Sequence, residues 1–429
     1  MSVGVSEDRP ILISARRASG FPLGPGLIMA ASGIGASDII TATVTGAKFG
    51  RELLWSLLIA TFLKFVLSEN LARWQLATGQ TVIEGWAKHL PRWVLMVFFG
   101  YLVIWAIAVS AALVNACGLA VETISHGVVP RTWGAVGHAI AGYWVIRAGT
   151  EENRASRWMR PLIVVMFFTI VACAGMTFRE PSTAIRGMLM PAIPKTAGPY
   201  VLSIIGGIGG SVTLLSYHYL LRDEGRVGLR HLTWARWDLV ISYAFTTIFG
   251  LSVMLIAERV FHSTGIAVSD RGAVSEMAAH LGVIVGPIGF FIYSAGFWAA
   301  VVASLLGVWQ TIPSVFADAY ALLRRWPDSK RREATHRTSP DYRKALLGMA
   351  LSSIPFAFLG RPVPIVIAFT ILGSLFIPFL SATLLYLNNF AITRWSVGRN
   401  RVLTNGVLVV ILLLFLWIGA LEIGALFRS

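Results

Sequence analysis

The stretch that decides the fold runs over Pro25–Gly46 and reads PGLIMAASGIGASDIITATVTG. It is apolar enough to enter a membrane, but small and polar residues interrupt it over Ser32–Asp38. A second apolar segment, Tyr200–Leu221, is interrupted in the same way over Gly206–Ser211. Because lipid cannot bond to unwound backbone, such breaks are tolerated only where protein or a water-filled cavity covers them. Two interruptions of this kind predict two broken helices with a binding site between the breaks.

The composition of the whole chain is that of a membrane protein. Of its 429 residues, 56% are hydrophobic and 13% are charged, and the mean hydropathy is +0.70. Soluble domains are far more polar. Apolar runs of roughly 20 residues can cross a bilayer, and we count eleven, centred near residues 35, 62, 105, 139, 168, 210, 247, 295, 350, 377 and 414.

The broken segments are the first and the sixth of these spans. This spacing predicts two inverted repeats of five helices each, with an eleventh helix added at the C-terminus. The predicted class is therefore an all-α polytopic membrane protein, organised as a single transmembrane domain over residues 1–429. Gradient-driven transporters are typically built in this way.

Positive charge is distributed unevenly between the two sides of these spans. If the N-terminus is cytoplasmic, 25 of the 36 Lys and Arg residues fall in cytoplasmic segments, 10 fall outside and Lys64 lies within a span. This bias predicts a cytoplasmic N-terminus and an external C-terminus, and the high pI of about 10.4 and compact loops suggest a bacterial inner membrane. Residues 1–20 are predicted to be a cytoplasmic tail. Residues 323–344 are predicted to be a basic cytoplasmic loop, disordered or helical, beside anionic lipid rather than nucleic acid.

The sequence gives no indication of an enzyme. It has no nucleophile elbow, phosphate-binding loop or metalloprotease helix. Without an ATP-binding loop, any active transport must be driven by a gradient. Cys117 and Cys173 both fall inside spans, where we interpret them as packing residues. We expect no cofactor and no obligate protein partner, and we expect contact with membrane lipids.

Three parts of the chain resemble the Nramp family of divalent metal transporters. Glu69–Arg73, followed by Thr78-Gly79, resembles the second span and inner loop of that family, and Ile377-Pro378-Phe379 fits its Leu-Pro-Phe turn in span ten. The resemblance implies a LeuT-type fold with broken helices one and six, and a divalent metal ion as the substrate. In the first span the shared frame consists of Gly24-Pro25-Gly26, Thr41, Gly46, Phe49-Gly50 and Leu53-Leu54-Trp55.

The residues that the family uses to bind metal are changed here. Its Asp-Pro-Gly-Asn break falls on Gly35-Ala36-Ser37-Asp38, so Gly35 replaces the metal-binding aspartate and Asp38 takes the asparagine position. The third span, which carries acidic proton-relay residues in the family, has no carboxylate over residues 98–120. Three further positions are changed: the methionine ligand is Leu214, the histidine of the proton route is Ser216, and the span-ten glutamine is Thr370.

Asp38 is the carboxylate predicted to lie nearest the middle of a broken span. An acid at that depth indicates a functional site, and we predict that Asp38 is a metal ligand; the alternative is that it only caps the following half-helix. Backbone carbonyls freed over Gly207–Gly210 would add oxygen ligands. Small hydroxyl residues are hard donors too, although they also mediate helix packing. Those expected to line the same cavity are Ser37, Thr41, Ser211, Thr213 and Ser216.

Other polar residues within the spans are assigned less direct roles. His218, two residues beyond Ser216, could accept protons because histidine titrates near neutral pH, although a packing role with satisfied hydrogen bonds is the alternative. We interpret Lys64 and Glu69 as structural, with Glu69 pairing to Arg73 one turn later. Asp238 is expected to form an inner-rim pair or gate beside Arg236, and Asp318 a similar one.

These departures bear on the substrate. A thioether ligand favours softer transition metals, whereas one carboxylate among hydroxyls suits a hard ion that keeps part of its water. The sequence therefore favours Mg²⁺, with Mn²⁺ as a second ion, moved by alternating access. An alternative is a LeuT-type transporter of a small organic solute such as an amino acid, in which Asp38 would bind the amine. A receptor or scaffold that transports nothing is a third possibility.

Overall fold

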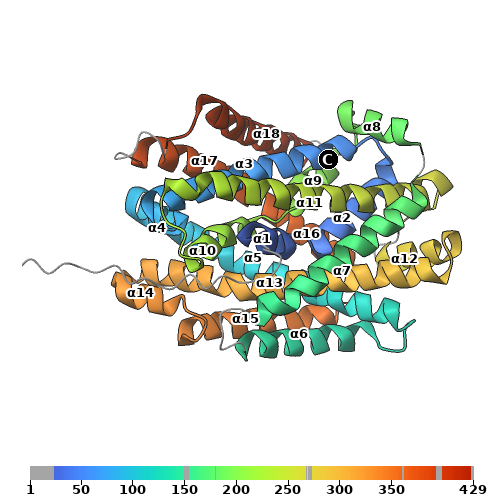
Figure 1. Ribbon diagram of the computed structural model, residues 1–429, viewed down its shortest axis with the longest axis horizontal. Coiled ribbons are helices and arrows are strands. Elements are labelled where there is room, and N and C mark those ends of the chain that lie inside the picture. Colours follow the sequence, from blue (N-terminus) through green and yellow to red (C-terminus); the bar gives the residue numbers. More distant parts are fainter. Residues whose placement is uncertain are drawn as a thin grey trace, which may run out of the picture.

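The computed structural model describes residues 24–148, 154–178, 180–266, 268, 273–359, 362–392 and 399–426. The predicted tail of residues 1–20 lies outside this part of the chain. The described residues form helices and connecting turns, without a strand. Most of the long helices run along one common direction, as in a bundle that crosses a membrane (Figure 1).

Among the described residues, the first half of the chain supplies eight helices. They are α1 (Pro25–Gly33), α2 (Ala36–Phe49), α3 (Leu54–Thr78), α4 (Val82–His89), α5 (Arg92–Ile124), α6 (Arg131–Arg147), α7 (Arg154–Thr177) and α8 (Pro181–Leu189).

The second half supplies the remaining helices and four short irregular ones. They are α9 (Gly198–Gly207), η1 (Val212–Leu215), α10 (Ser216–Asp223), η2 (Leu229–His231), α11 (Leu232–Val260), η3 (His262–Thr264), α12 (Ala273–Ile284), α13 (Pro287–Leu323), α14 (Asp328–Ala334), α15 (Pro340–Ala357), α16 (Pro362–Ser374), α17 (Phe376–Tyr386), η4 (Leu387–Ala391) and α18 (Val402–Leu426).

The eleven predicted spans each correspond to a helix or to a pair of helices. Seven helical segments of the described chain are long and apolar enough to cross a membrane as they stand. The first span misses that length because it is divided into α1 and α2. The span near residue 139 misses it because α6 has 17 residues. The described helices therefore agree with the all-α class expected from the sequence.

Both predicted breaks are present. The first lies between Gly33, the end of α1, and Ala36, the start of α2; the second follows Gly207, the end of α9. Gly209 and Gly210 have φ angles of 73° and 83°, a left-handed conformation that costs glycine little. The two breaks touch, because a Cβ added at Gly33 would lie 2.8 Å from the carbonyl carbon of Gly209. The two unwound segments therefore form one continuous region.

The tenth span is interrupted as its proline predicts. α16 ends at Ser374 and α17 begins at Phe376, with a turn at Leu375. Pro378 has no N–H to donate to the carbonyl of Ser374, four residues earlier, so the regular helix cannot continue through this point.

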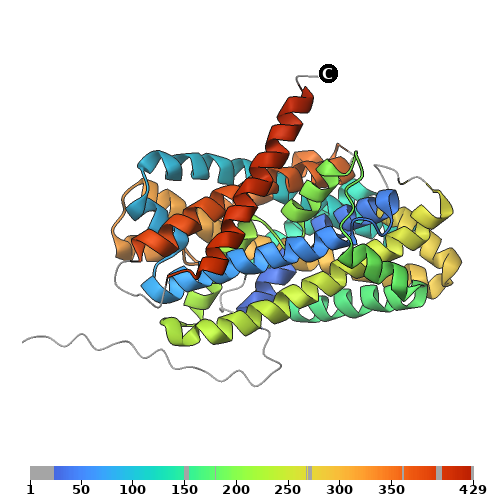
Figure 2. The same ribbon diagram turned by 90° about the horizontal axis from the view of Figure 1, so that it is seen from above.

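The broken helices lie at the centre of the bundle. α1 packs against α11 on one side and against α13 on the other, and α2 packs mainly on α11 (Figure 1). The ten spans of the two predicted repeats, α1 to α17, are called the ten-helix core. α18 follows this core, crosses it obliquely, and its later part projects beyond it (Figure 2). Because protein surrounds α1 and α2, their unwound ends are shielded from lipid.

Candidate functional site

Asp38 joins the two breaks. It lies in the first turn of α2 and is fully buried. Its Oδ2 accepts hydrogen bonds from the N–H of Gly35 at 3.2 Å and from the Ser37 hydroxyl at 3.3 Å. Its Oδ1 accepts the N–H of Gly209, in the other break, at 3.0 Å. The carboxylate therefore caps its own half-helix, and it also binds the broken sixth span, which consists of α9, η1 and α10 and is called helix six from here on. The capping role considered for Asp38 is present, and its role as a metal ligand stays a prediction.

Lys64 binds the same segment of helix six from α3. Its side chain is fully buried, and its Nζ donates to the carbonyl oxygens of Ile208 at 3.0 Å, of Gly206 at 3.3 Å and of Gly210. From the sequence, the carbonyls over Gly207–Gly210 are expected to be free. In the structure they are occupied by an ammonium group.

Sequence reasoning missed Lys64 as a site residue. The available signal was a lysine in the middle of an otherwise apolar span, which is a functional indication in its own right. From the sequence we interpret Lys64 as structural, because its spacing from Glu69 places the two side chains on different faces of α3. The structure shows why this spacing was uninformative: the partners of Lys64 are backbone carbonyls and the charge of Asp38.

Three hydroxyl groups form a chain beside Asp38. Thr41 and Ser203 lie 3.4 Å apart between their oxygens, and Ser203 and Thr370 lie 2.9 Å apart. The chain links α2, α9 and α16, and all three residues are buried. The structure therefore brings together the predicted residues Thr41 and Thr370, through Ser203, which the sequence analysis did not select.

The predicted residues after the second break face different neighbours. The Ser216 hydroxyl donates to the hydroxyl of Thr311 on α13 at 2.9 Å. Thr213 is buried next to Gly210, and its hydroxyl has no hydrogen-bond partner among the described residues. Ser211 packs against Gly373 of α16. Leu214, at the methionine position, is fully buried and contributes no donor atom.

Gly35 is enclosed by α13 and α5. A Cβ at this position would lie 2.5 Å from the Oγ of Ser304 and 3.5 Å from Leu113. The Ser304 hydroxyl also donates to the carbonyl of Ser32, at the end of α1, at 2.8 Å. An acidic side chain at position 35 therefore has no room, because Ser304 fills that space and satisfies a carbonyl of the break.

His218 is buried on α10 without hydrogen bonds. Neither ring nitrogen has a partner in the part of the chain that the structure describes, and the ring lies 4.4 Å from that of Tyr219 between centroids. The alternative of a packing histidine with satisfied hydrogen bonds is therefore wrong. A buried imidazole without partners is costly, and the role of His218 as a proton site stays a prediction.

Near the predicted cytoplasmic side, Asp238 binds the first turn of α1. Its Oδ2 accepts the N–H of Gly26 at 2.7 Å and the Tyr217 hydroxyl at 3.1 Å. The expected pairing with Arg236 is wrong. Arg236 instead pairs with Glu69 at 2.8 Å, because two residues of helix turn it to a different face from Asp238. The predicted pair of Glu69 with Arg73 is confirmed, at 2.5 Å.

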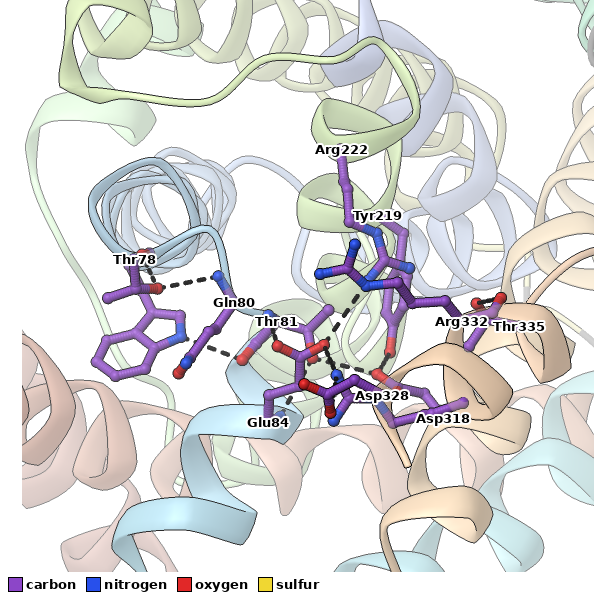
Figure 3. A network of polar contacts seen from close by, with 12 residues as sticks. Thr78, Gln80, Thr81, Glu84, Tyr219, Arg222, Asp318, Asp328, Arg332 and Thr335 are labelled. Atoms are coloured by element: carbon purple, nitrogen blue, oxygen red, sulfur yellow. Dashed lines mark hydrogen bonds and ion pairs between the residues drawn. The ribbon is translucent and has the colours of Figure 1, made fainter. Parts of the chain in front are cut away.

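A larger buried ion network lies on the same side. Figure 3 shows Glu84, Asp318 and Arg222 turned toward one another from α4, α13 and α10. Arg331 of α14 lies 2.8 Å from Glu84 and 3.5 Å from Asp318. The Tyr219 hydroxyl donates to Asp318 at 2.5 Å. Asp318 therefore forms a buried pair, with Arg331, while its role as a gate stays a prediction. Part of the basic loop at residues 323–344 is a helix whose Arg331 is buried.

The donor set around the breaks restricts what could bind there. Among the described residues, no three His, Cys, Asp or Glu side chains come close enough to hold a metal ion together. A cation at this site would be bound by Asp38, backbone carbonyls, hydroxyls and water. All of these are oxygen donors, which hard cations prefer.

Two broken helices at the centre of a ten-helix core, with charged groups bound to the breaks, define a membrane transporter of the LeuT-like class. The family model described as "Natural resistance-associated macrophage protein-like", or Nramp, matches residues 26–423. The chain therefore belongs to the Nramp family, a family of divalent metal transporters, and is a transporter rather than an enzyme.

Similarity to individual proteins is low in sequence but extensive in coverage. The divalent metal cation transporter MntH of Klebsiella pneumoniae subsp. pneumoniae is 24% identical over 307 residues, which are 68% of this chain and 72% of that protein. MntH of Chromohalobacter salexigens is 26% identical over 307 residues, 66% of this chain and 68% of that protein.

Solved structures agree in fold. The manganese transporter of Eremococcus coleocola superimposes with a TM-score of 0.72 at 15% identity, over 94% of this chain and 86% of that chain. MhsT in complex with L-phenylalanine superimposes with a TM-score of 0.57 at 15% identity, over 90% and 97% of the two chains. The LeuT-type fold predicted from the sequence is confirmed.

Proposed function

We propose that this transporter moves Mg²⁺, and also Mn²⁺, by alternating access, and that Asp38 binds the ion. The observation that carries the proposal is the position of Asp38: a buried carboxylate that bonds to both breaks at once. Because Asp38 is hydrogen-bonded to both breaks, its interactions depend on the relative position of helices one and six. Binding of a cation can then be coupled to their movement.

The preference for Mg²⁺ over softer ions is supported by the absence of a sulfur donor. Leu214 stands where the family has a methionine, so the ligands near the break are all oxygens. Mg²⁺ keeps several water molecules when bound and needs few protein ligands. We assign the binding of such water to the hydroxyls of Ser37 and Thr41, which lie on the same half-helix as Asp38.

The acidic proton-relay residues of the family have no counterpart over residues 98–120 of α5, which include no carboxylate. We propose that His218 is the proton site if transport is coupled to protons. Its buried ring without hydrogen bonds supports this assignment, as does its position two residues beyond Ser216.

Uptake into liposomes tests the proposal. Purified wild-type protein is reconstituted beside Asp38→Asn, and Mg²⁺ and Mn²⁺ entry are followed with internal indicators. We expect uptake by the wild type and its loss in the variant. The matched control is Asp328→Asn, which changes a carboxylate whose side chain is 79% exposed and should leave uptake intact. Strong Cd²⁺ uptake with weak Mg²⁺ uptake would contradict the assigned selectivity.

A second function is favoured by one observation. The ammonium of Lys64 and the carboxylate of Asp38 both bind the second break, from different sides, and opposite charges of this kind suit the carboxylate and amine of a zwitterion. The similarity in fold to MhsT in complex with L-phenylalanine is compatible with this reading. Thermal stabilisation by amino acids, with none by divalent salts, would support an organic solute over a metal ion.

A further inference from the structure

We propose that the ammonium of Lys64 is a tethered cation that fills a cation site built by the carbonyls of helix six, and that a free cation enters this site only when Lys64 leaves it. The second part rests on the proposed function, since it takes the entering cation to be the substrate. The first part concerns the carbonyl site alone.

The carbonyl oxygens converge as they do in a cation site. Three of them, from Gly206, Ile208 and Gly210, accept from one nitrogen atom. The left-handed backbone at Gly209 and Gly210 allows alternate carbonyls of this segment to face the same point. Convergent backbone carbonyls are the means by which proteins replace the water shell of a metal ion.

Two further contributions make this point negative. α9 ends here, so the negative end of its dipole faces the same region. Asp38 binds the N–H of Gly209 from the other side, and its charge acts on Lys64. A positive charge at this position therefore gains from carbonyls, dipole and carboxylate together, whether it belongs to an ion or to a side chain.

A purely structural role for Lys64 leads to a different expectation. A lysine that only fastens α3 to helix six could be lost with a simple decrease in stability, and added salts would not restore it. A lysine that stands in for an ion leaves behind a site that an ion can occupy. Removing its charge should then create a binding activity.

Lys64→Met tests this difference, because methionine fills a similar volume without charge or donor. The purified variant is unfolded thermally in Na⁺, K⁺, Mg²⁺ and Mn²⁺ chlorides, with choline chloride at matched ionic strength. We expect at least one of these cations to stabilise Lys64→Met at a concentration about tenfold or more below that needed for the wild type, as for removal of a competing ligand. Equal cation dependence in the two proteins would overturn the proposal.

Three further variants serve as controls for the cation dependence of Lys64→Met. Lys48→Met removes a positive charge near the end of α2, away from the breaks, and should behave as the wild type. Lys64→Gln is a second neutral variant for use if Lys64→Met does not fold. Asp38→Asn combined with Lys64→Met removes the carboxylate too and should lose most of the gained stabilisation.

The outcomes separate this proposal from the proposed function. Cation-dependent stability of Lys64→Met, with no Mg²⁺ or Mn²⁺ uptake by the wild type, would support the tethered cation and reject metal transport. Uptake by the wild type, with cation-independent stability of both Lys64 variants, would support metal transport and reject the tethered cation.

Discussion

The N–H of Gly26 donates to Oδ2 of Asp238 at 2.7 Å, across 212 residues of chain. The Tyr217 hydroxyl donates to the same oxygen at 3.1 Å. One carboxylate on α11 therefore holds the first turn of α1 and the second half of helix six together. In the proposed alternating access, these are the parts of the broken helices that would separate to open the site toward the predicted cytoplasmic side.

Asp238→Asn should loosen this end of the molecule. Hydrogen bonds to a charged acceptor contribute about 1.5–3 kcal/mol each, and the amide keeps only part of that interaction. We expect faster hydrogen exchange of the amides of Gly26, Leu27 and Ile28, with the end of α2 unchanged. Exchange in α1 that matches the wild type would show that Asp238 does not hold this turn. Asp328→Asn is the control.

Asp38→Asn should be less stable than the variant that removes both charges. The charge of Asp38 acts on the buried Lys64 without a direct contact, so losing Asp38 alone leaves a buried charge less well compensated, at a cost on the order of a few kcal/mol. Asp38→Asn with Lys64→Met has no unpaired charge, so we expect it to unfold at a higher temperature than Asp38→Asn alone. Thermal denaturation of the four proteins in one choline buffer gives the coupling energy. Strictly additive effects would indicate that the two charges do not interact.

Gly35→Ala should destabilise the first break through Ser304. The added Cβ would lie 2.5 Å from the Ser304 Oγ, which is too close without movement of α13. We expect Gly35→Ala with Ser304→Gly to be less destabilised than the sum of the single variants, as measured by thermal denaturation. Gly137→Ala, with open space around the same addition, is the matched control and should not lower stability.

Arg331→Met should make the free energy of unfolding depend more strongly on pH than in the wild type. Burial raises the pKa of Glu84, the nearby charge of Asp318 raises it further, and Arg331 opposes both effects. The folded protein then binds a proton more tightly than the unfolded chain, so stability is highest below the ordinary glutamate value of 4.5 and falls as pH rises through the raised pKa. Without Arg331 this fall should be larger. Melting temperatures from about pH 4.5 to pH 8 in wild type and variant would show it.

A profile for Arg331→Met that runs parallel to the wild type would contradict this account. Arg332→Met is the control, since it removes an exposed charge from the neighbouring position of α14.

His218→Phe should remove any pH dependence of uptake while leaving the fold intact. The phenyl ring can keep the contact with Tyr219, and no hydrogen bond is lost because the imidazole has none in the described structure. We expect Mg²⁺ uptake by the variant to be equal at the two external pH values at which the wild type differs most. A variant that retains the pH profile of the wild type would exclude His218 as the proton site.

The positions of the breaks could be predicted from sequence because they depend on local chemistry. Glycine and serine runs within Pro25–Gly46 and Tyr200–Leu221 cannot form regular lipid-facing helix, and this holds wherever the helices pack. The Glu69–Arg73 pair was predictable for the same reason, since residues four apart meet on any helix.

The hydrogen bonds of Lys64, and that of Asp238 with Gly26, could not be predicted, because their partners are backbone groups far away in the chain. A carbonyl of Ile208 or an N–H of Gly26 carries no signature in the side-chain sequence. Which face of α3 meets helix six depends on the packing of the whole bundle. Of the hydroxyl chain Thr41, Ser203, Thr370, the sequence pointed to Thr41 and Thr370 but not to Ser203, because their contact follows only from the approach of α2, α9 and α16.

The placement of Lys64 opposite Asp38 has an electrical consequence. Together the two groups carry no net charge, whether both are ionised or both are neutral. Moving one unit charge through 100 mV of membrane potential takes about 2.3 kcal/mol. When the unloaded carrier returns, these two groups move no net charge across the membrane, so the membrane potential does no work on them. A bound divalent ion adds its own charge to the step that carries it across. Membrane voltage should therefore act on the loaded carrier and leave the return of the unloaded one unaffected.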